Sequence, residues 1–170
     1  SKKYQEEDFN EYKGIVFTSS NAIKNLEIKK INKNIYCYCV GLATEKTAKL
    51  NGFQNIYTAE GNVNNLKEII LQTFNANNGR LLYVSGEIVS SNLDKELIFE
   101  GYSIKRLINY SVLPIEDLDL KFVDILKSSM PEIVFIYSQN SAKNFLNLIK
   151  KYQLFDFWMN TNLMCIGEKT

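Results

Sequence analysis

Residues 15–26 read Ile15-Val16-Phe17-Thr18-Ser19-Ser20-Asn21-Ala22-Ile23-Lys24-Asn25-Leu26. The first three residues are β-branched or aromatic, which is typical of a buried strand. The next four carry hydroxyl or amide side chains, which bond nearby backbone N–H groups and favour turns and helix N-caps. Ala22, Ile23 and Leu26 are then spaced as on one face of a helix. The stretch therefore predicts a strand, a polar turn and a helix whose positive end suits an anionic group.

The same order of residues recurs later in the chain. Residues 134–145 read Val134-Phe135-Ile136-Tyr137-Ser138-Gln139-Asn140-Ser141-Ala142-Lys143-Asn144-Phe145. In this alignment Ser19 corresponds to Ser138, and Asn21 corresponds to Asn140. Residues 38–44 and 164–170 also match, each a strand-like run followed by Gly and then by Thr. Two matches in the same order favour duplication of a half-domain, which predicts two similar lobes.

The composition excludes several classes of protein. The chain has 170 residues and a net charge of +1, so it is long enough for one domain or two small ones, and no global charge steers it to nucleic acid or to a membrane surface. It contains no histidine, which excludes Ser-His and Cys-His nucleophilic machinery and His-ligated metal. Cys37, Cys39 and Cys165 lie in apolar runs without metal-ligand spacing, and we expect buried structural thiols in a reducing compartment. No apolar run reaches the ~18 residues of a spanning helix, so the expected location is cytoplasmic.

Strands and helices alternate along the chain. The predicted strands are Ile15–Phe17, Ile35–Val40, Gln54–Thr58, Arg80–Val84, Tyr102–Leu113, Ile133–Tyr137 and Leu163–Ile166. The predicted helices are a short one around Asp8–Tyr12, then Ser20–Lys29, Leu42–Asn51, Val63–Phe74, Asn92–Phe99, Lys121–Ser128 and Ser141–Tyr152. This alternation predicts right-handed βαβ units around parallel sheets, an α/β fold. We place a boundary at Leu113-Pro114, which gives a complete α/β lobe at residues 1–113 and part of a second, split lobe at residues 114–170.

An ordered series of short motifs runs through most of the chain. The series is Phe17-Thr18-Ser19-Ser20-Asn21-Ala22, Val40-Gly41-Leu42-Ala43-Thr44, Gly52-Phe53, Tyr83-Val84-Ser85-Gly86, Gly101-Tyr102, Ile108-Asn109-Tyr110, Ser138-Gln139-Asn140-Ser141 and Ile166-Gly167-Glu168-Lys169-Thr170. In this order the motifs resemble those of the uroporphyrinogen-III synthase family. The resemblance implies two flavodoxin-like lobes with parallel sheets, joined by a hinge. The family's opening strand and helix do not precede Ser1, and its closing elements do not follow Thr170, so we expect the second lobe to be incomplete in this sequence.

The resemblance also implies a reaction. Such an enzyme is a cofactor-independent lyase of tetrapyrrole and haem biosynthesis. Its substrate is hydroxymethylbilane, a linear tetrapyrrole with many carboxylates, which is cyclised to uroporphyrinogen III with inversion of the last pyrrole ring. Holding a flexible chain so that its ends meet is catalysis by positioning. The resemblance implies no cofactor or metal, a monomer, and no nucleic-acid or membrane partner.

The candidate site residues lie at the ends of the predicted strands. Tyr110 corresponds to the tyrosine that the family places at the end of the inter-lobe strand, and the resemblance makes it the candidate acid for the departing hydroxyl. A phenol is a weak acid at neutral pH, so we expect a modest contribution, and a strand aromatic that only packs is the alternative. The candidate substrate-binding residues are Thr18, Ser19, Asn21, Gly41, Thr44, Ser85, Gly86, Ser138, Gln139, Asn140, Gly167 and Thr170. Helix capping and turn formation are the alternative roles for these residues.

A second function class fits the same pattern. A non-catalytic two-lobed α/β module that binds a small anionic ligand by hinge closure would explain the repeat, the polar turns and the connector at Pro114. Such a module has no need of Tyr110, which separates the two hypotheses. A nucleotide-binding Rossmann domain is disfavoured because the sequence has no Gly-x-Gly-x-x-Gly turn. A phosphoacceptor receiver domain is disfavoured because no Asp ends a predicted core strand.

Overall fold

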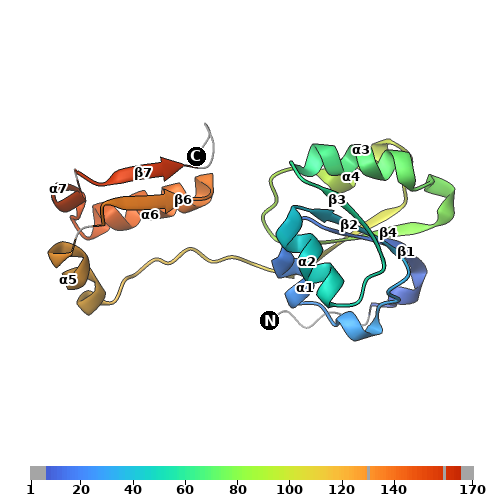
Figure 1. Cartoon of the computed structure of the whole chain (residues 1–170), viewed down its shortest axis with the longest axis horizontal. Coiled ribbons are helices and arrows are strands. Elements are labelled where there is room, and N and C mark those ends of the chain that lie inside the picture. The colour runs from blue at the N-terminus through green and yellow to red at the C-terminus, as the bar shows by residue number, and fades with distance from the viewer. Residues whose placement is uncertain (1–6, 130, 159, 166–170) are drawn as a thin grey trace. The chain divides into compact units, whose positions relative to one another are not determined.

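The computed structural model describes residues 7–129, 131–158 and 160–165. By its internal contacts the chain divides into two compact units, Ser1–Val112 and Leu113–Thr170 (Figure 1). The boundary predicted between residues 113 and 114 lies beside this division. Each unit has its own sheet and its own buried cluster of apolar side chains.

A five-stranded parallel sheet forms the centre of the first unit. Its strands are β1 (Tyr12–Phe17), β2 (Tyr36–Val40), β3 (Asn55–Ala59), β4 (Arg80–Gly86) and β5 (Ile104–Tyr110). Their order across the sheet is β3-β2-β1-β4-β5, and every neighbouring pair is parallel. The α/β class and the parallel sheet that the alternating pattern predicts are confirmed.

The strand order corrects one detail of the prediction for this unit. A flavodoxin-like sheet has the order 2-1-3-4-5, whereas this sheet has the order 3-2-1-4-5 of the doubly wound dinucleotide-binding fold. The chain moves outward from β1 through β2 to β3, and residues 60–79 then carry it back across β2 and β1 to β4. The sequence pattern shows that a crossover exists but not how many strands it passes, so the pattern left the order open.

Helices cover both faces of this sheet (Figure 1). In the described part of the unit they are α1 (Ser20–Lys24), α2 (Leu42–Leu50), α3 (Val63–Thr73) and α4 (Leu93–Phe99). Phe17 packs in one cluster with Ile23 of α1, and Val16 packs in the other cluster with Leu66 of α3. Successive residues of β1 thus face different cores, as the pleat of a strand requires. Burying each such side chain contributes ~1.5–3 kcal/mol. Because β1 has buried side chains in both clusters, it helps to stabilise both faces of the sheet.

Several element boundaries differ from the prediction; β1, for example, begins at Tyr12 and not at Ile15, and β4 ends at Gly86 and not at Val84. The helix predicted at Ser20–Lys29 ends at Lys24 and is followed by a 3₁₀ turn at Ile28–Lys30. The cause is Asn25, whose Nδ2 donates to the carbonyl of Asn21 (2.9 Å), since such local side-chain bonds compete with helix continuation. β5 ends at Tyr110 and not at Leu113, and the short helix predicted around Asp8–Tyr12 is a 3₁₀ turn at Phe9–Glu11 that leads directly into β1.

The second unit contains a two-stranded parallel sheet. Its elements are α5 (Leu120–Ser128), β6 (Ile133–Ile136), α6 (Gln139–Lys151), α7 (Phe155–Trp158) and β7 (Asn162–Cys165), of which α7 was not predicted. Val123, Ile149 and Leu154 form its buried cluster. Cys165 is exposed, which corrects the prediction of three buried thiols; Cys37 and Cys39 are buried in β2. In the described part of this unit the sheet has two strands, and all four residues of β7, Cys165 included, are exposed.

The two copies of the repeated stretch have the same local structure. Ser19 is the N-cap of α1 with φ −156° and ψ 144°, and Ser138 is the N-cap of α6 with φ −161° and ψ 155°. Each hydroxyl accepts a hydrogen bond from a backbone N–H in the first turn of its helix. The strand, polar turn and helix that the sequence predicts are therefore present in both units.

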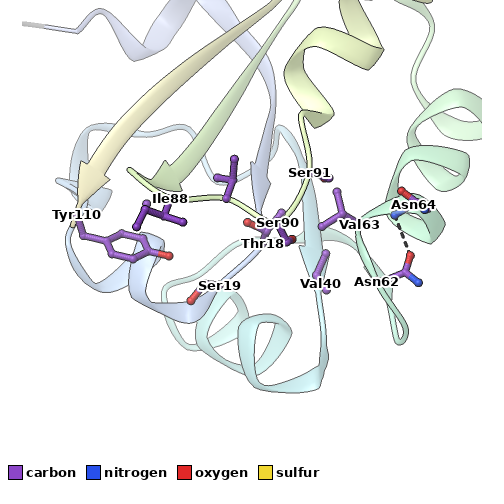
Figure 2. A pocket seen from close by; sticks show the side chains of 12 residues that line it. Thr18, Ser19, Val40, Asn62, Val63, Asn64, Ile88, Ser90, Ser91 and Tyr110 are labelled. Carbon is purple, nitrogen blue, oxygen red and sulfur yellow. Dashed lines mark hydrogen bonds between the residues drawn. The ribbon is translucent and has the colours of Figure 1, made fainter. Parts of the chain in front are cut away.

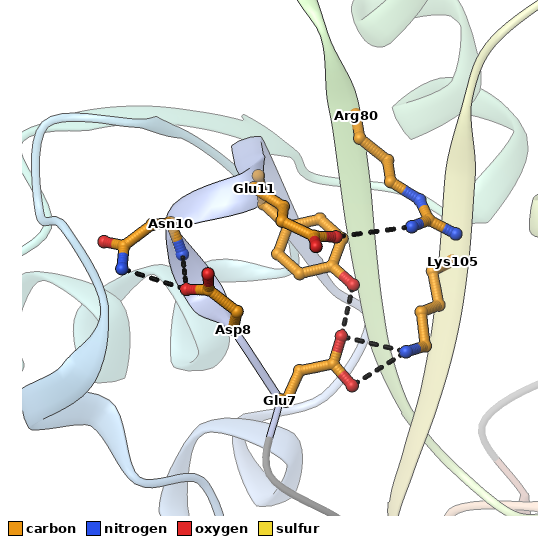
Figure 3. Close-up of polar contacts among 7 residues, drawn as sticks. Glu7, Asp8, Asn10, Glu11, Arg80 and Lys105 are labelled. Atoms are coloured by element: carbon orange, nitrogen blue, oxygen red, sulfur yellow. Dashed lines mark hydrogen bonds and ion pairs between the residues drawn. The ribbon is translucent and has the colours of Figure 1, made fainter.

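The first unit is tied to its N-terminal segment at the amino end of the sheet (Figure 3). Lys105 Nζ donates to both carboxylate oxygens of Glu7 (2.9 and 2.8 Å), and the hydroxyl of Tyr12 donates to the same carboxylate. Burial opposes ionisation of Glu7, but the hydrogen bonds from Lys105 and Tyr12 outweigh it and lower the pKa of Glu7. This anchor lies at the end of the sheet opposite to the candidate site described next.

Candidate functional site

The carboxyl ends of the parallel strands meet along one edge of the sheet. From β1 the chain continues towards β2 on one side, whereas β4 continues towards β5 on the other side. The crevice between β1 and β4 is therefore a topological switch point, the place where open α/β sheets bind their ligands. The polar turn at Thr18 and Ser19 and the turn at Gly86 lie on the two sides of this crevice.

A pocket of about 460 Å³ opens at this crevice (Figure 2). It is lined by Thr18, Ser19, Val40, Asn62, Val63, Asn64, Gly86, Ile88, Val89, Ser90, Ser91 and Tyr110. These residues come from the ends of β1, β2, β4 and β5, from the first turn of α3 and from residues 87–92, which we call the β4–α4 loop. Four of the candidate residues predicted from the sequence lie together here: Thr18, Ser19, Gly86 and Tyr110.

A β-bulge directs the Tyr110 side chain to this pocket. Ser85 pairs with Ile108 and Gly86 pairs with Tyr110, so β5 advances two residues where β4 advances one. In a regular strand Leu107 and Tyr110 would face opposite sides of the sheet, but here both pack against the same buried cluster. The carbonyl of Tyr110 also accepts a hydrogen bond from the N–H of Glu87 (2.9 Å), which fixes the start of the β4–α4 loop.

Gly86 is the surface on which the Tyr110 ring rests. A Cβ atom added at Gly86 would lie 2.8 Å from both Cε2 and Cζ of the ring and 3.1 Å from its hydroxyl. Real Cβ atoms do not approach other atoms so closely, so only glycine leaves room for the ring in this position. A side chain at this position would have to displace the ring, so the close contact links the position of the phenol to that of the Gly86 backbone.

Two hydroxyl groups at the end of β1 face the crevice. Thr18 Oγ1 lies 3.3 Å from the hydroxyl of Tyr83, a residue of β4 that is 1% exposed. Burial raises the pKa of Tyr83, although the hydrogen bond with Thr18 and the charge of Arg106 act in the opposite direction. Ser19 Oγ accepts from the N–H of Asn21 (3.3 Å) and keeps its own hydrogen for a ligand. Thr18 and Ser19 thus combine turn formation with exposure to the pocket.

Ser85 precedes Gly86, which lines the pocket. It is 1% exposed, and its Oγ donates to the carbonyl of Gly86 (3.0 Å) and accepts from Arg106 Nε (2.8 Å). The candidate residue Ser85 therefore does not line the cavity, but it contacts Gly86, which does. Arg106 is half-buried and brings a permanent positive charge to this edge of the sheet.

The first turn of α3 and the β4–α4 loop were not predicted as parts of the site. Asn62 caps α3 by accepting from the N–H groups of Asn64 (2.9 Å) and Asn65 (3.2 Å). The sequence showed a turn leading into this helix, and that turn was the available signal. Its position beside the crevice depends on the crossover from β3 to β4, which the pattern does not encode. Ser90 and Ser91 of the loop add two more hydroxyl groups to the pocket lining.

Three further candidates of the first unit lie outside the pocket lining. Gly41 is the N-cap of α2 with φ 78°, and its N–H donates to the carbonyl of Ala59 (2.8 Å). Thr44 is 4% exposed in the first turn of α2, and Asn21 is exposed in α1. A role of these residues in substrate binding stays a prediction, and their visible role is in starting the two helices.

Five of the candidate residues belong to the second unit. Ser138, Gln139 and Asn140 are exposed at the turn from β6 to α6, where Ser138 Oγ accepts from the N–H of Ser141 (3.1 Å). Gly167 and Thr170 lie outside the described residues. The turn after β6 offers the same kind of hydroxyl group as the turn after β1.

Comparison with known proteins identifies the family. The model of a family described as uroporphyrinogen-III synthase HemD matches residues 2–170. The chain belongs to the uroporphyrinogen-III synthase HemD family. Its fold is similar to the crystal structure of uroporphyrinogen-III synthetase from Helicobacter pylori 26695, with a TM-score of 0.65, 21% sequence identity, and coverage of 99% of this chain and 83% of that chain. A comparison with curated proteins gave no match.

Membership of the uroporphyrinogen-III synthase family confirms the resemblance that the ordered motifs predicted, and it assigns the chain to tetrapyrrole biosynthesis. Among the residues that the structure describes, no group of three or more His, Cys, Asp or Glu side chains could hold a metal ion. No described helix combines the length and the apolar character needed to cross a bilayer. The pocket of this uroporphyrinogen-III synthase family member contains a half-buried phenol, hydroxyl groups from the turn after β1 and from the β4–α4 loop, and amide groups from the first turn of α3, with the guanidinium of Arg106 nearby.

Proposed function

We propose that this protein cyclises hydroxymethylbilane to uroporphyrinogen III with inversion of the last pyrrole ring. The observation that carries the proposal is the position of Tyr110, whose ring rests on Gly86 in a hydroxyl-lined pocket at the topological switch point. In this reaction the terminal hydroxyl leaves as water after gaining a proton, and the last ring is inverted before the macrocycle closes. The proposal includes a monomer that acts in the cytoplasm without metal or cofactor.

Tyr110 is proposed as the acid that protonates or hydrogen-bonds the departing hydroxyl. Its side chain is half-buried, so the phenol is held by the sheet while one side of it faces the cavity (Figure 2). A positioned phenol supplies a directed hydrogen bond with little loss of conformational freedom on binding. The chain has no histidine that could serve instead.

The substrate carboxylates are proposed to bind the polar turns. Thr18 and Ser19 offer hydroxyl groups, and Gly86 offers its backbone. The positively charged guanidinium of Arg106 is hydrogen-bonded to the carbonyl of Gly86. Hydroxyl and amide donors at strand ends bind carboxylates without a basic surface, in keeping with a net charge of +1. We extend the proposal to the remaining predicted ligands: Asn21, Gly41, Thr44, Ser85, Ser138, Gln139, Asn140, Gly167 and Thr170.

The proposal is tested by identifying the product. The protein is incubated with hydroxymethylbilane, the porphyrinogens are oxidised, and the type III and type I isomers are separated by chromatography. We expect type III in excess of the type I isomer that forms spontaneously. If the protein binds hydroxymethylbilane in calorimetry but leaves the product as type I, the non-catalytic binding module is the correct interpretation and the synthase proposal fails.

Replacing Tyr110 with Phe tests the proposed acid. Tyr110→Phe removes one hydroxyl and keeps the ring on Gly86, so we expect kcat to fall by about 100-fold, the lower end of the range for general acids. The unfolding midpoint in urea should stay close to that of the wild type. Tyr102→Phe is the matched control, since the Tyr102 hydroxyl donates to the carbonyl of Phe74 (2.9 Å), away from the pocket. Wild-type kcat in the Tyr110 variant would exclude the role.

A further inference from the structure

The guanidinium of Arg106 makes an unusual set of contacts with the end of β4. Nε donates to Ser85 Oγ (2.8 Å), and Nη2 donates to the carbonyls of Gly86 (2.9 Å) and Glu87 (2.9 Å). One side chain of β5 therefore holds three successive residues of the neighbouring strand and its loop. The planar arrangement of donors in arginine permits this, whereas a lysine ammonium has no such fixed fork.

The pairing of β4 and β5 brings Arg106 to this place. Tyr83 and Arg106 are direct neighbours in the parallel register, so the Arg106 side chain starts on the same face as Tyr83 and Ser85. Its charge acts on Tyr83, whose hydroxyl is 3.3 Å from Thr18 in the pocket lining. The guanidinium thus lies between the buried part of β4 and the loop that closes one side of the pocket.

The contacts connect Arg106 with Tyr110 through Gly86. Arg106 fixes the carbonyl of Gly86, and the Tyr110 ring occupies the space where a Gly86 side chain would be. The N–H of Glu87 donates to the carbonyl of Tyr110 (2.9 Å), so the start of the loop is held both by Arg106 and by Tyr110. A shift of the Gly86 peptide would move the surface that supports the phenol.

We propose that Arg106 is a positioning residue that holds Gly86 and the start of the β4–α4 loop, and thereby keeps the Tyr110 phenol aligned in the pocket. This inference rests on the proposed function for its kinetic consequence, whereas its structural consequence can be measured without turnover. Arg106→Lys keeps the charge and removes the fork, so it isolates the role of the three hydrogen bonds.

The first test observes Tyr110 directly. 3-Fluorotyrosine is placed at position 110, and its ¹⁹F resonance is recorded in the full chain. Arg106→Lys should shift or broaden the resonance, and Ser85→Ala, which removes one of the three contacts, should shift it less in the same direction. Arg80→Lys is the matched control: Arg80 is the other arginine of the chain, it lies in β4 at the amino end of the sheet, and its guanidinium pairs with Glu11 at 3.5 Å. An unchanged resonance in the folded Arg106 variant would overturn the proposal.

The second test is a double-mutant cycle on turnover. A misplacement of about 1 Å in a catalytic group can cost about 10²-fold, so Arg106→Lys should lower kcat by about tenfold or more, with a smaller change in KM. In the Tyr110→Phe background the same substitution should have little further effect on kcat, because Arg106 acts through the phenol. Equal losses in both backgrounds would show a general structural role and would contradict the proposal. Absence of type III product from the wild type would defeat the proposed function alone, because the ¹⁹F test still decides the link between Arg106 and Tyr110.

Discussion

At the scale of single residues, the position of the Tyr110 ring depends on the absence of a side chain at Gly86. Gly86 has no Cβ, and the ring of Tyr110 fills the space that a methyl group would need. The two positions were predicted from separate motifs, and only the structure shows that they are in contact. A short polar turn and a distant aromatic residue therefore form a single unit of the site.

Gly86→Ala tests this contact. The added methyl group would lie 2.8 Å from the Tyr110 ring, so we expect the ring to be displaced and kcat to fall. The free energy of unfolding should decrease by about 1 kcal/mol, the low end of the cost of overpacking, because the atoms met are the outer end of a half-buried ring. Urea unfolding and steady-state kinetics measure the two effects. In a Tyr110→Ala background the same substitution should cost much less. If Gly86→Ala costs the same in both backgrounds, the ring is not the group that excludes the side chain.

The residues that sequence reasoning found and missed differ in one physical respect. Thr18 and Ser19 directly follow β1, whereas Gly86 and Tyr110 are the last residues of β4 and β5. Parallel strands place their carboxyl ends along one edge of the sheet. The polar turns at the strand ends could therefore be predicted from the local pattern, whereas Tyr110 was singled out by the resemblance to the uroporphyrinogen-III synthase family. The missed residues are Asn62 at the first turn of α3, Ser90 in the β4–α4 loop and Arg106 in β5. Their positions near the site depend on tertiary packing, which no local sequence pattern contains.

At the scale of elements, the first turn of α3 is stabilised by a reciprocal cap. Asn62 Oδ1 accepts from the N–H groups of Asn64 and Asn65, and Asn65 Oδ1 accepts from the N–H of Asn62 (3.2 Å). α4 offers a natural contrast, because its N-cap residue Asn92 makes no side-chain hydrogen bond to its helix. The two asparagines occupy equivalent positions with different contacts.

We therefore expect Asn62→Ala and Asn92→Ala to differ. Loss of the cap at Asn62 should lower the free energy of unfolding by about 1 kcal/mol, whereas Asn92→Ala should change it by less than about 0.5 kcal/mol. Urea denaturation of both variants measures the difference. Because Asn62 also lines the pocket, hydroxymethylbilane should bind more weakly to the first variant only. Equal stability losses would show that the cap geometry does not determine the stability of α3.

The anchor at Glu7 makes stability depend on pH. The pKa of Glu7 is lower in the folded than in the unfolded chain, so the unfolded chain takes up the proton first as the pH falls. The contribution of the anchor is complete above the ordinary glutamate pKa of 4.5 and is lost as the pH falls through the lower, folded pKa. Glu7→Gln should therefore lower the free energy of unfolding by about 1 kcal/mol at neutral pH, a figure that allows for solvent screening at Lys105.

The measurement is urea unfolding of wild type and Glu7→Gln from about pH 6 to about pH 3, where the difference should shrink as the pH decreases. Glu11→Gln is the control, because the Glu11 side chain is 56% exposed and lies 3.5 Å from Arg80, so its ion pair contributes little. A difference between wild type and Glu7→Gln that stays constant over this range would refute the assignment of the charge effect to Glu7.

The predicted elements illustrate what a local pattern can determine. The strand at Ile15–Phe17 and the polar turn after it were predicted because their side-chain types are distinctive. The early end of α1 was not, because the bond from Asn25 to the carbonyl of Asn21 competes with a helical pattern that is otherwise regular. The strand order was open for a different reason, since the reach of a crossover depends on packing over the whole sheet.

At the scale of the whole molecule, each buried cluster draws its residues from one unit. The two clusters of the first unit lie on the faces of its sheet, and the third cluster lies wholly in the second unit. Residues 111–119 between the units form neither helix nor strand, and Val112, Leu113 and Ile115 are 68%, 81% and 60% exposed. The units should therefore unfold as separate cooperative bodies.

Limited proteolysis checks this organisation. Thermolysin, which cleaves before large apolar residues, should cut first at Val112, Leu113 or Ile115, because these side chains are exposed in extended backbone. The fragment that contains the first unit should retain cooperative unfolding in urea. Replacing the three residues with Ser should slow the first cut without changing the stability of the first unit. A first cut within β1 to β5 would contradict the division.

The β-bulge in β5 determines which face of the sheet the Tyr110 side chain occupies. In a regular strand, odd and even positions belong to opposite faces, so a residue's face follows from counting along the chain. The additional residue before Tyr110 reverses this count, so the Tyr110 ring packs on the same face as Leu107, against the cluster that contains Phe17. Loss of the bulge without a deletion would turn the phenol to the other face, whereas deletion of the extra residue would restore regular pairing and keep the ring on the face of Leu107. The face that Tyr110 occupies therefore follows from its pairing with Gly86, and the proposed role of the phenol depends on that pairing as well as on the tyrosine itself.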